Sequence, residues 1–530
     1  MIQPTDSGAM RSSAQRNAAH SLREDYRHSL RNCKVKYLVE AFIQSARIHS
    51  QQLAVVTGRE SVTYRQLLDA SLKCAGSLFE QPNWTPGSRV LLRMPNSAGY
   101  IAAFYGILIA GGVVVPLPVE QTATSVEQIA SATASGFLID ESGLRGTEDL
   151  FSSLHRGMRD EVEVHPSQLA AIFFTSGSAG KPKGVMLSHR NFLANAGSIQ
   201  ASLPLLQTDR TLAILPFCHA YGNSVLQSHV LAGATLVIDG STAFPETIID
   251  AMAQHRVTSF SGVPQLHQVL FRSLRMNTEV LPDLRYATVA GGALRPELLQ
   301  DFSERLAPAE LFVMYGQTEA TARLSCLPAH QLSTHCGSIG RGIPGVRLQV
   351  VTENGNPVEP GCVGEIRACG DNVMEGYWLD PESTQAIVQD GWLYTGDLAT
   401  VDEDGYIYPQ GRKSQLLKIA GYRLHPAEIE AVIAEVMPAV EAVVVPFESI
   451  DGLTRLAMFI IPVRSGISPD LTAVRACFIR RLAHYQRPAY LAILNDPPLT
   501  ASLKVDRQRL TQMATESANR RSVRPSVIPS

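Results

Sequence analysis

The chain has 530 residues, of which 45% are hydrophobic and 18% are charged. One hydrophobic core does not extend over such a length, so we expect two or more globular domains. The formal net charge of -3 argues against a dedicated nucleic-acid binder, because such proteins normally carry a basic excess. We therefore expect no nucleic-acid partner.

The start of the chain and its cysteines indicate the compartment. Residues 1–36 are rich in Ser, Arg, Asn and Gln and lack the apolar segment of a secretory signal, so we expect a disordered extension. The eight cysteines are scattered, with no C-x-x-C pair, which indicates neither a zinc site nor a disulfide framework. A reducing, cytoplasmic location fits this pattern best.

From residue 37 onward, helical and strand-like segments alternate. One helix is predicted to begin at Val62. The uncharged stretch 98–119 is long enough to span a bilayer, but Gly111-Gly112 and the apolar run after it indicate a helix, a turn and a buried strand, and no membrane span. Further strands are predicted over 89–92, 169–174, 211–215, 234–238, 259–263 and 286–290. Strands separated by helices predict parallel sheets covered on both faces.

The composition changes after residue 337. Gly, Pro and Val dominate residues 343–370 and predict short antiparallel strands. A boundary follows at 411–414, and beyond it we expect a smaller α+β unit with helices over 426–436 and 473–483 and strands over 440–446 and 457–461. The polar, basic tail 517–530 is predicted to be disordered.

A loop directly after the 169–174 strand reads Thr-Ser-Gly-Ser-Ala-Gly-Lys-Pro-Lys-Gly over residues 175–184. Small residues let backbone N–H groups approach an oxyanion, hydroxyls add donors and lysines add positive charge, so the loop suits a polyphosphate. It is not a Walker loop, because Lys181 is followed by Pro182. Nor is it a nucleophile elbow, because no glycine lies two residues before Ser176 or Ser178.

Six further stretches follow in order: 216–222 (PFCHAYG), 291–293 (GGA), 315–319 (YGQTE), 394–398 (YTGDL), 411–423 (GRKSQLLKIAGYR) and 498–507 (PLTASLKVDR). Together with the loop, they resemble the adenylate-forming (AMP-binding) superfamily, in particular its acyl-CoA synthetases and acyl-AMP ligases. Any one of these residues taken alone has an ordinary structural explanation. The resemblance rests on the co-occurrence of the motifs from about residue 37 to 510.

The resemblance implies an α/β fold. A large N-terminal AMP-binding domain, 37–411, would contain two parallel-rich sheets flanked by helices plus a distorted β-barrel. Residues 412–414 would form a hinge, and 415–516 a small mobile α+β C-terminal lid domain. Rotation of the lid would exclude water from one step and admit a thiol to the next.

The same resemblance implies ATP-dependent activation of a carboxylic acid to an acyl-adenylate with release of pyrophosphate, then transfer to a thiol. Bringing two anions together makes this catalysis mainly positioning and charge neutralisation. Lys504 would bridge the two anions, His219 would lie at the substrate carboxylate, Thr318 would contact the α-phosphate, and Lys418 would act in thiol transfer. Glu319 would bind Mg²⁺.

Nucleotide binding would use residues from several motifs. The phosphates of ATP would be held by the loop, adenine by Tyr315 and the small residues near it, and the ribose by Asp397 with help from Arg412. The ATP-binding residues implied in this way are Thr175, Ser176, Gly177, Ser178, Gly180, Lys181, Lys183, Gly291, Gly292, Ala293, Tyr315, Gly316, Thr318, Asp397 and Arg412.

Three positions depart from the family pattern. Ala179 stands where the loop usually has Thr, Ser414 where the hinge usually has Asp or Lys, and Leu503 where Gly usually precedes the lysine. A Leu would be strained if that backbone needs a positive φ. These departures keep open an alternative, a degenerate member that binds nucleotide or acyl ligand without turnover.

The substrate segment 213–234 contains no Asp or Glu. An amino-acid substrate would bury an ammonium without a counter-charge, which is costly, so a fatty or aryl acid is favoured over the alternative of a free-standing amino-acid adenylation protein. The predicted acid pocket comprises His219, Tyr221, Asn223, Val263, Gly292 and Thr321. We expect the thiol to be delivered in trans, by coenzyme A or by the phosphopantetheine of an acyl carrier protein.

Overall fold

The computed structural model describes residues 37–144, 168–175, 182–241, 244–271, 273, 275–277, 279–292, 296–413, 417–419, 422–424, 426–437, 440–449, 453–462, 469–500 and 505–521. Several predictions lie outside these residues: the N-terminal extension, the phosphate-loop residues 176–181, Ala293, the hinge Ser414, and Leu503 with Lys504. The side chain of Lys418 also lies outside them.

The first sheet has nine strands in the order β15-β14-β13-β12-β11-β9-β10-β1-β2. Its central strands run parallel, as predicted, and β2, β14 and β15 are antiparallel additions at the two edges. The strands are β1 (Leu53–Val56), β2 (Ser61–Thr63), β9 (Arg210–Leu212), β10 (Thr235–Val237), β11 (Ser259–Gly262), β12 (Tyr286–Val289), β13 (Glu310–Tyr315), β14 (Ser325–Leu327) and β15 (Arg341–Gly342).

The second sheet has seven strands in the order β18-β8-β7-β4-β3-β5-β6. Strands β7, β4, β3 and β5 are parallel, whereas β6, β8 and β18 are antiparallel to their neighbours. The strands are β3 (Arg89–Arg93), β4 (Val113–Pro116), β5 (Phe137–Asp140), β6 (Gly143–Leu144), β7 (Leu169–Thr175), β8 (Lys183–Ser188) and β18 (Gly376–Tyr377).

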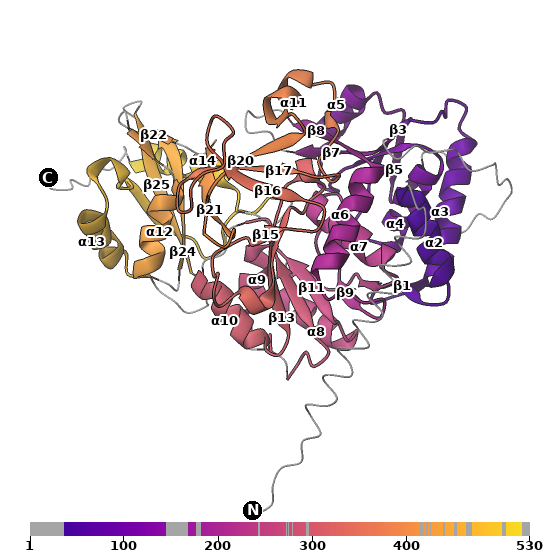
Figure 1. Ribbon diagram of the computed structural model, residues 1–530, viewed down its shortest axis with the longest axis horizontal. Coiled ribbons are helices and arrows are strands. Elements are labelled where there is room, and N and C mark those ends of the chain that lie inside the picture. Colours follow the sequence, from indigo (N-terminus) through magenta and orange to yellow (C-terminus); the bar gives the residue numbers. More distant parts are fainter. Residues whose placement is uncertain are drawn as a thin grey trace, which may run out of the picture.

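A layer of helices lies between these two sheets (Figure 1) and shares one apolar core with both. It contains α2 (Leu38–Ile48), α3 (Tyr64–Phe79), α4 (Ala98–Ile109), α6 (His189–Ser202) and α7 (Ala220–Leu231). Every residue of α4 is buried, which explains its uniform apolarity without a bilayer. Among the described residues, no helix is both long and apolar enough to cross a membrane.

Helix α3 begins at Tyr64, two residues later than predicted, because Val62 belongs to β2. The start is fixed by a capping box: Thr63 accepts from the backbone N–H of Gln66, and the Gln66 side chain accepts from the backbone N–H of Thr63. Ser188 and Asn191 form the same arrangement at the start of α6. Local polar side chains thus set helix boundaries that hydrophobic periodicity leaves open.

The outer face of the nine-stranded sheet packs against three helices, α8 (Pro245–Gln254), α9 (Pro264–Phe271) and α10 (Pro296–Leu306). The third sheet is antiparallel, as residues 343–370 predicted, and comprises β16 (Arg347–Val351), β17 (Gly364–Cys369), β19 (Val388–Gln389), β20 (Trp392–Val401) and β21 (Ile407–Arg412). The described part of the chain also contains α5 (Ala123–Thr133), α11 (Pro381–Ile387), η1 (Thr318–Ala320), η2 (Ala329–Gln331) and η4 (His484–Gln486).

The chain beyond Arg412 forms the smaller α+β unit, drawn in gold and yellow in Figure 1. Helices α12 (Pro426–Val436) and α13 (Leu471–Arg481) share a core with one face of a three-stranded sheet, and α14 (Arg507–Arg521) packs on the other. The sheet comprises β24 (Val440–Glu448), β25 (Thr454–Pro462) and β26 (Tyr490–Ile493), and a separate hairpin comprises β22 (Leu417–Ile419) and β23 (Tyr422–Leu424).

The prediction that the disordered tail begins at 517 is wrong for residues 517–521, because α14 continues to Arg521. The buried side chains of Leu510 and Ala514 anchor this helix to the sheet. The polar composition of this segment did not indicate a helix, because most helical stability in proteins comes from packing one face of the helix against the rest of the fold.

Candidate active site

A cleft of about 1430 Å³ brings the separated motifs together. Its walls come from the end of β7, the segment before α7, the ends of β12 and β13, the third sheet, and Thr500 of the C-terminal unit. The predicted site residues that line it are Thr175, Lys183, His219, Tyr221, Val263, Gly291, Gly316, Thr318, Glu319 and Arg412. Motifs that are up to 325 residues apart in the sequence, as Thr175 and Thr500 are, thus share one cavity, which is large enough for a nucleotide.

Asp397 lies on β20 directly opposite Arg412 of β21, so the sheet register pairs them. The Arg412 Nε donates to Asp397 Oδ1 at 2.8 Å, and the Tyr315 hydroxyl donates to Oδ2 at 2.6 Å. Burial lowers the pKa of Arg412, but the neighbouring carboxylate outweighs this effect and the pKa lies above its ordinary value. The carboxylate has about four acceptor positions in all, so both oxygens retain capacity for the hydroxyls of a ribose.

Glu319 lies on η1 at the edge of the cleft. Its Oε1 accepts a 2.8 Å hydrogen bond from the hydroxyl of Tyr377, which comes from β18 of the other large sheet. Among the described residues, no group of three His, Cys, Asp or Glu side chains could hold a metal. A single carboxylate beside a phosphate site nevertheless fits Mg²⁺, which keeps several waters and is usually bound by one or two carboxylates plus substrate phosphates.

The loop that carries Glu319 has an unusual backbone. Thr321 and Ala322 have φ angles of 55° and 96°, a region that side chains other than glycine rarely adopt. The loop also folds back on itself so closely that a Cβ at Gly316 would lie 1.8 Å from the Ala322 carbonyl oxygen. Such conformations persist only where the surroundings enforce them, and they concentrate at functional sites.

The ends of the phosphate loop are held as a hairpin, because Thr175 of β7 pairs with Lys183 of β8. The Lys183 Nζ donates to Ser383 Oγ at 2.9 Å and lies 4.8 Å from the centre of the Tyr377 ring. Thr175 and Lys183 both line the cleft. The two described ends of the loop therefore both border the cavity.

Asn96, which our sequence reasoning missed, fixes the segment that leads to His219. Its Nδ2 donates to the carbonyl oxygens of Ala213 at 2.9 Å and Leu215 at 2.8 Å, and its Oδ1 accepts from the Phe217 N–H at 2.8 Å. His219 follows directly as the residue before α7. The sequence shows only an Asn-Ser pair before a helix, which indicates a cap and nothing about a contact more than one hundred residues away.

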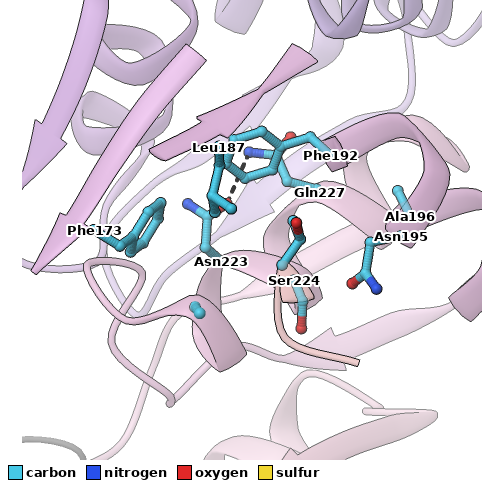
Figure 2. Close-up of a pocket in the computed structure, with 10 residues that line it drawn as sticks. Phe173, Leu187, Phe192, Asn195, Ala196, Asn223, Ser224 and Gln227 are labelled. Atoms are coloured by element: carbon cyan, nitrogen blue, oxygen red, sulfur yellow. Dashed lines mark hydrogen bonds between the residues drawn. The ribbon is translucent and has the colours of Figure 1, made fainter. Parts of the chain in front are cut away.

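The predicted acid pocket divides into two parts. His219, Tyr221 and Val263 line the large cleft, whereas Asn223 and Thr321 line an adjoining cavity of about 10 Å³ (Figure 2). This smaller space holds about one water molecule. Figure 2 shows the polar side chains that surround it, including the 3.2 Å hydrogen bond from Gln227 Nε2 to Asn223 Oδ1.

Gly292 is described but is not among the residues that line either space. Arg323, a second residue that our sequence reasoning missed, does line the large cleft, and its guanidinium carbon lies 4.1 Å from the centre of the Tyr221 ring. The only signal in the sequence was its position four residues after Glu319, within the motif region.

Residues 42–378 match the family of AMP-binding enzymes. This is more than half of the chain, which therefore belongs to that family, and the predicted resemblance is confirmed.

Two enzymes illustrate the similarity. A long-chain-fatty-acid–CoA ligase of Escherichia coli O6:H1 is 28% identical, covering 90% of this chain and 94% of its own. A 2-succinylbenzoate–CoA ligase of Bacillus velezensis is 28% identical, and the alignment covers 89% of this chain and 97% of that ligase.

Solved structures confirm the predicted fold class. The o-succinylbenzoate CoA synthetase from Bacillus subtilis, in complex with ATP and magnesium ion, superposes with a TM-score of 0.76 at 27% identity and covers 89% of this chain and 98% of its own. The anthranilate CoA ligase AuaEII in complex with anthranoyl-AMP superposes with a TM-score of 0.79 at 22% identity. The superposition covers 91% of this chain and 98% of that ligase, so the two proteins share a fold.

Proposed function

We propose that this protein is an ATP-dependent, AMP-forming ligase that joins a carboxylic acid to AMP, releases pyrophosphate and passes the acyl group to a thiol. The observation that carries the proposal is the convergence of Arg412, Glu319 and His219 on one cleft, with Asp397 held beside it by its ion pair with Arg412. Each comes from a different segment of the chain, and each supplies a group that this reaction requires. The relatives named above are themselves acid–CoA ligases.

Nucleotide binding would begin at the Asp397 cluster. The ionised carboxylate, held by Arg412 and Tyr315, accepts hydrogen bonds from the ribose hydroxyls, and adenine lies between Tyr315 and the Gly291 turn. The phosphates extend from there toward the β7–β8 loop. Lys183 at the end of that loop adds positive charge where the leaving pyrophosphate forms.

Glu319 would hold Mg²⁺ against the phosphates, and the bound cation would neutralise charge on the pyrophosphate. Tyr377 donates to one oxygen of Glu319, so it orients the carboxylate and leaves the other oxygen for the cation. Thr318, beside Glu319 on the cleft wall, would donate its hydroxyl to the α-phosphate. The attacking carboxylate would approach from the side of His219.

We infer that the C-terminal unit acts as a lid that brings Lys504 to the two anions. Two observations support this role: Thr500 lines the cleft, and Leu499 pairs with Val505, so described residues on both sides of Lys504 lie close together. Lys504, once brought to the cleft by the lid, would cancel charge where the acid oxygen meets the α-phosphate. Residues 412–414 would be the hinge, and the β22–β23 hairpin that carries Lys418 would face the cleft after rotation.

The alternative of an amino-acid substrate is less well supported by the pocket. A positively charged guanidinium, Arg323, lies beside Tyr221, where it would repel an ammonium group. Coenzyme A is the acceptor that the relatives' names indicate, and a carrier-protein phosphopantetheine is the second candidate. Both acceptors deliver the same thiol.

Mass spectrometry of the products formed from a library of acids with ATP and Mg²⁺, with and without coenzyme A or a carrier protein, tests the proposal. We expect acyl-AMP and pyrophosphate without a thiol, and a thioester with one. Release of ADP and phosphate would refute it. Absence of acyl-AMP for every acid, with ATP binding intact, would favour the degenerate binding protein instead.

A further inference from the structure

Arg323 is a charged side chain in the interior. It is 2% exposed and is among the largest fully buried side chains of the described residues. An arginine remains protonated even when burial lowers its pKa, so this position carries a full positive charge. Burying such a charge is costly unless an anion pairs with it.

The partners of Arg323 are neutral. Its Nε lies 3.4 Å from Ser224 Oγ, its Nη1 lies 2.6 Å from Met314 Sδ, and its guanidinium lies over the Tyr221 ring. Among the ion pairs of the described residues, none includes Arg323. The buried carboxylate of Asp209 is paired elsewhere, with Arg285.

The charge lies where the acid would bind. Arg323 borders the cleft together with His219 and Tyr221, and it contacts α7 through Tyr221 and Ser224. Helix α7 begins directly after His219, and both contact residues lie within its first five positions, so Arg323 meets the same end of the helix. An acid whose reacting carboxylate lies at His219 therefore reaches Arg323 with its opposite end after a short linker.

We propose that Arg323 is the counter-charge for a second anionic group on the substrate, which makes the substrate class a dicarboxylic acid. The planar guanidinium matches a carboxylate in shape and can donate two parallel hydrogen bonds to it. The inference rests on the function proposed above and narrows its substrate. The loop backbone at Thr321 and Ala322, with positive φ angles, fixes the segment from which Arg323 extends.

The test compares each dicarboxylic acid of a series of increasing length with its own monoamide, which has nearly the same shape and lacks the distal charge. The measurement is kcat/KM for pyrophosphate release by the full-length protein with ATP and Mg²⁺. We expect the wild type to prefer at least one diacid over its monoamide by about 10-fold or more, as for a hydrogen-bonded charged group. Arg323→Met removes this preference by raising KM for the diacid, and Arg323→Lys restores part of it.

Arg305→Met is the matched control, because Arg305 also lies over an aromatic ring, that of Phe271 on α9, but is not among the residues that line the cleft. It should leave the diacid preference unchanged. A wild type that uses monoamides as well as every diacid would overturn the inference, as would an Arg323→Met protein that keeps the preference.

The wild-type comparison decides the question even if the variants fail to fold. Adenylation of monoacids alone would leave the proposed function intact and refute only the diacid inference, whereas no acyl-AMP from any acid would refute the function itself.

Discussion

Replacing Asn96 by Ala should damage both the stability of the large domain and the use of the acid substrate. Asn96 is partly buried and forms three hydrogen bonds to the backbone of residues 213–217, with lengths between 2.8 and 2.9 Å. Each such bond contributes about 0.5–1.5 kcal/mol. The expected loss in the free energy of unfolding is therefore about 3 kcal/mol.

The Asn96→Asp substitution separates the two hydrogen bonds that the side chain donates from the one that it accepts. The carboxylate can still accept from the Phe217 N–H, but it faces the carbonyl oxygens of Ala213 and Leu215 with no donor. Acceptors that face each other repel, so this variant should be at least as unstable as Asn96→Ala at pH 7. A result in which Asp restores stability would show that the acceptor bond alone holds the segment.

The assays are urea denaturation and steady-state kinetics of acyl-AMP formation. Because the segment leads directly to His219, kcat/KM for the acid should fall more than 10-fold, with a smaller change in KM for ATP. Asn83→Ala is the control, since Asn83 is exposed, and it should change stability by less than about 0.5 kcal/mol. Wild-type stability and acid kinetics in Asn96→Ala would refute the reasoning.

Three further outcomes follow from the site and the core. Lys504→Ala should abolish adenylation yet spare thioester formation from supplied acyl-AMP, and equal loss of both steps would contradict its assigned role. Tyr377→Phe removes the hydrogen bond to Glu319 and should raise the Mg²⁺ concentration for half-maximal activity about 10-fold; an unchanged Mg²⁺ titration would count against it. Burial lowers the pKa of His189, His229 and His267 to about 4, below the value of 6.5 that they have when unfolded. Above pH 6.5 these histidines are neutral in both states, and the folded protein has its full stability. As the pH falls from 6.5 toward 4, the unfolded chain binds protons that the folded protein does not, so the free energy of unfolding decreases. Urea denaturation across that range should show the free energy of unfolding falling by up to about 4 kcal/mol per pH unit because of these three histidines. The His267→Phe substitution should reduce that pH dependence by about 1.4 kcal/mol per pH unit.

The sequence alone determined the class of fold and most of the elements. Helix α12 and strands such as β7 and β3 lie at or within one residue of the predicted bounds. The reason is local: apolar periodicity, caps and glycine turns act between residues a few positions apart, and they are legible without the fold. The motifs were legible for the same reason, because each is a short run of adjacent residues.

Only the tertiary structure decided which side chains support those motifs. Asn96 forms hydrogen bonds with residues 117 to 121 positions further along the chain, and Tyr377 donates a hydrogen bond to Glu319, which is 58 positions away. Such contacts depend on the order of strands in the sheets, for instance the pairing of β18 with β8 that brings Tyr377 into place. Among the described residues the charge of Arg323 has no anionic partner. This is equally invisible in the sequence, since an arginine is normally solvated and only burial makes its charge require a partner.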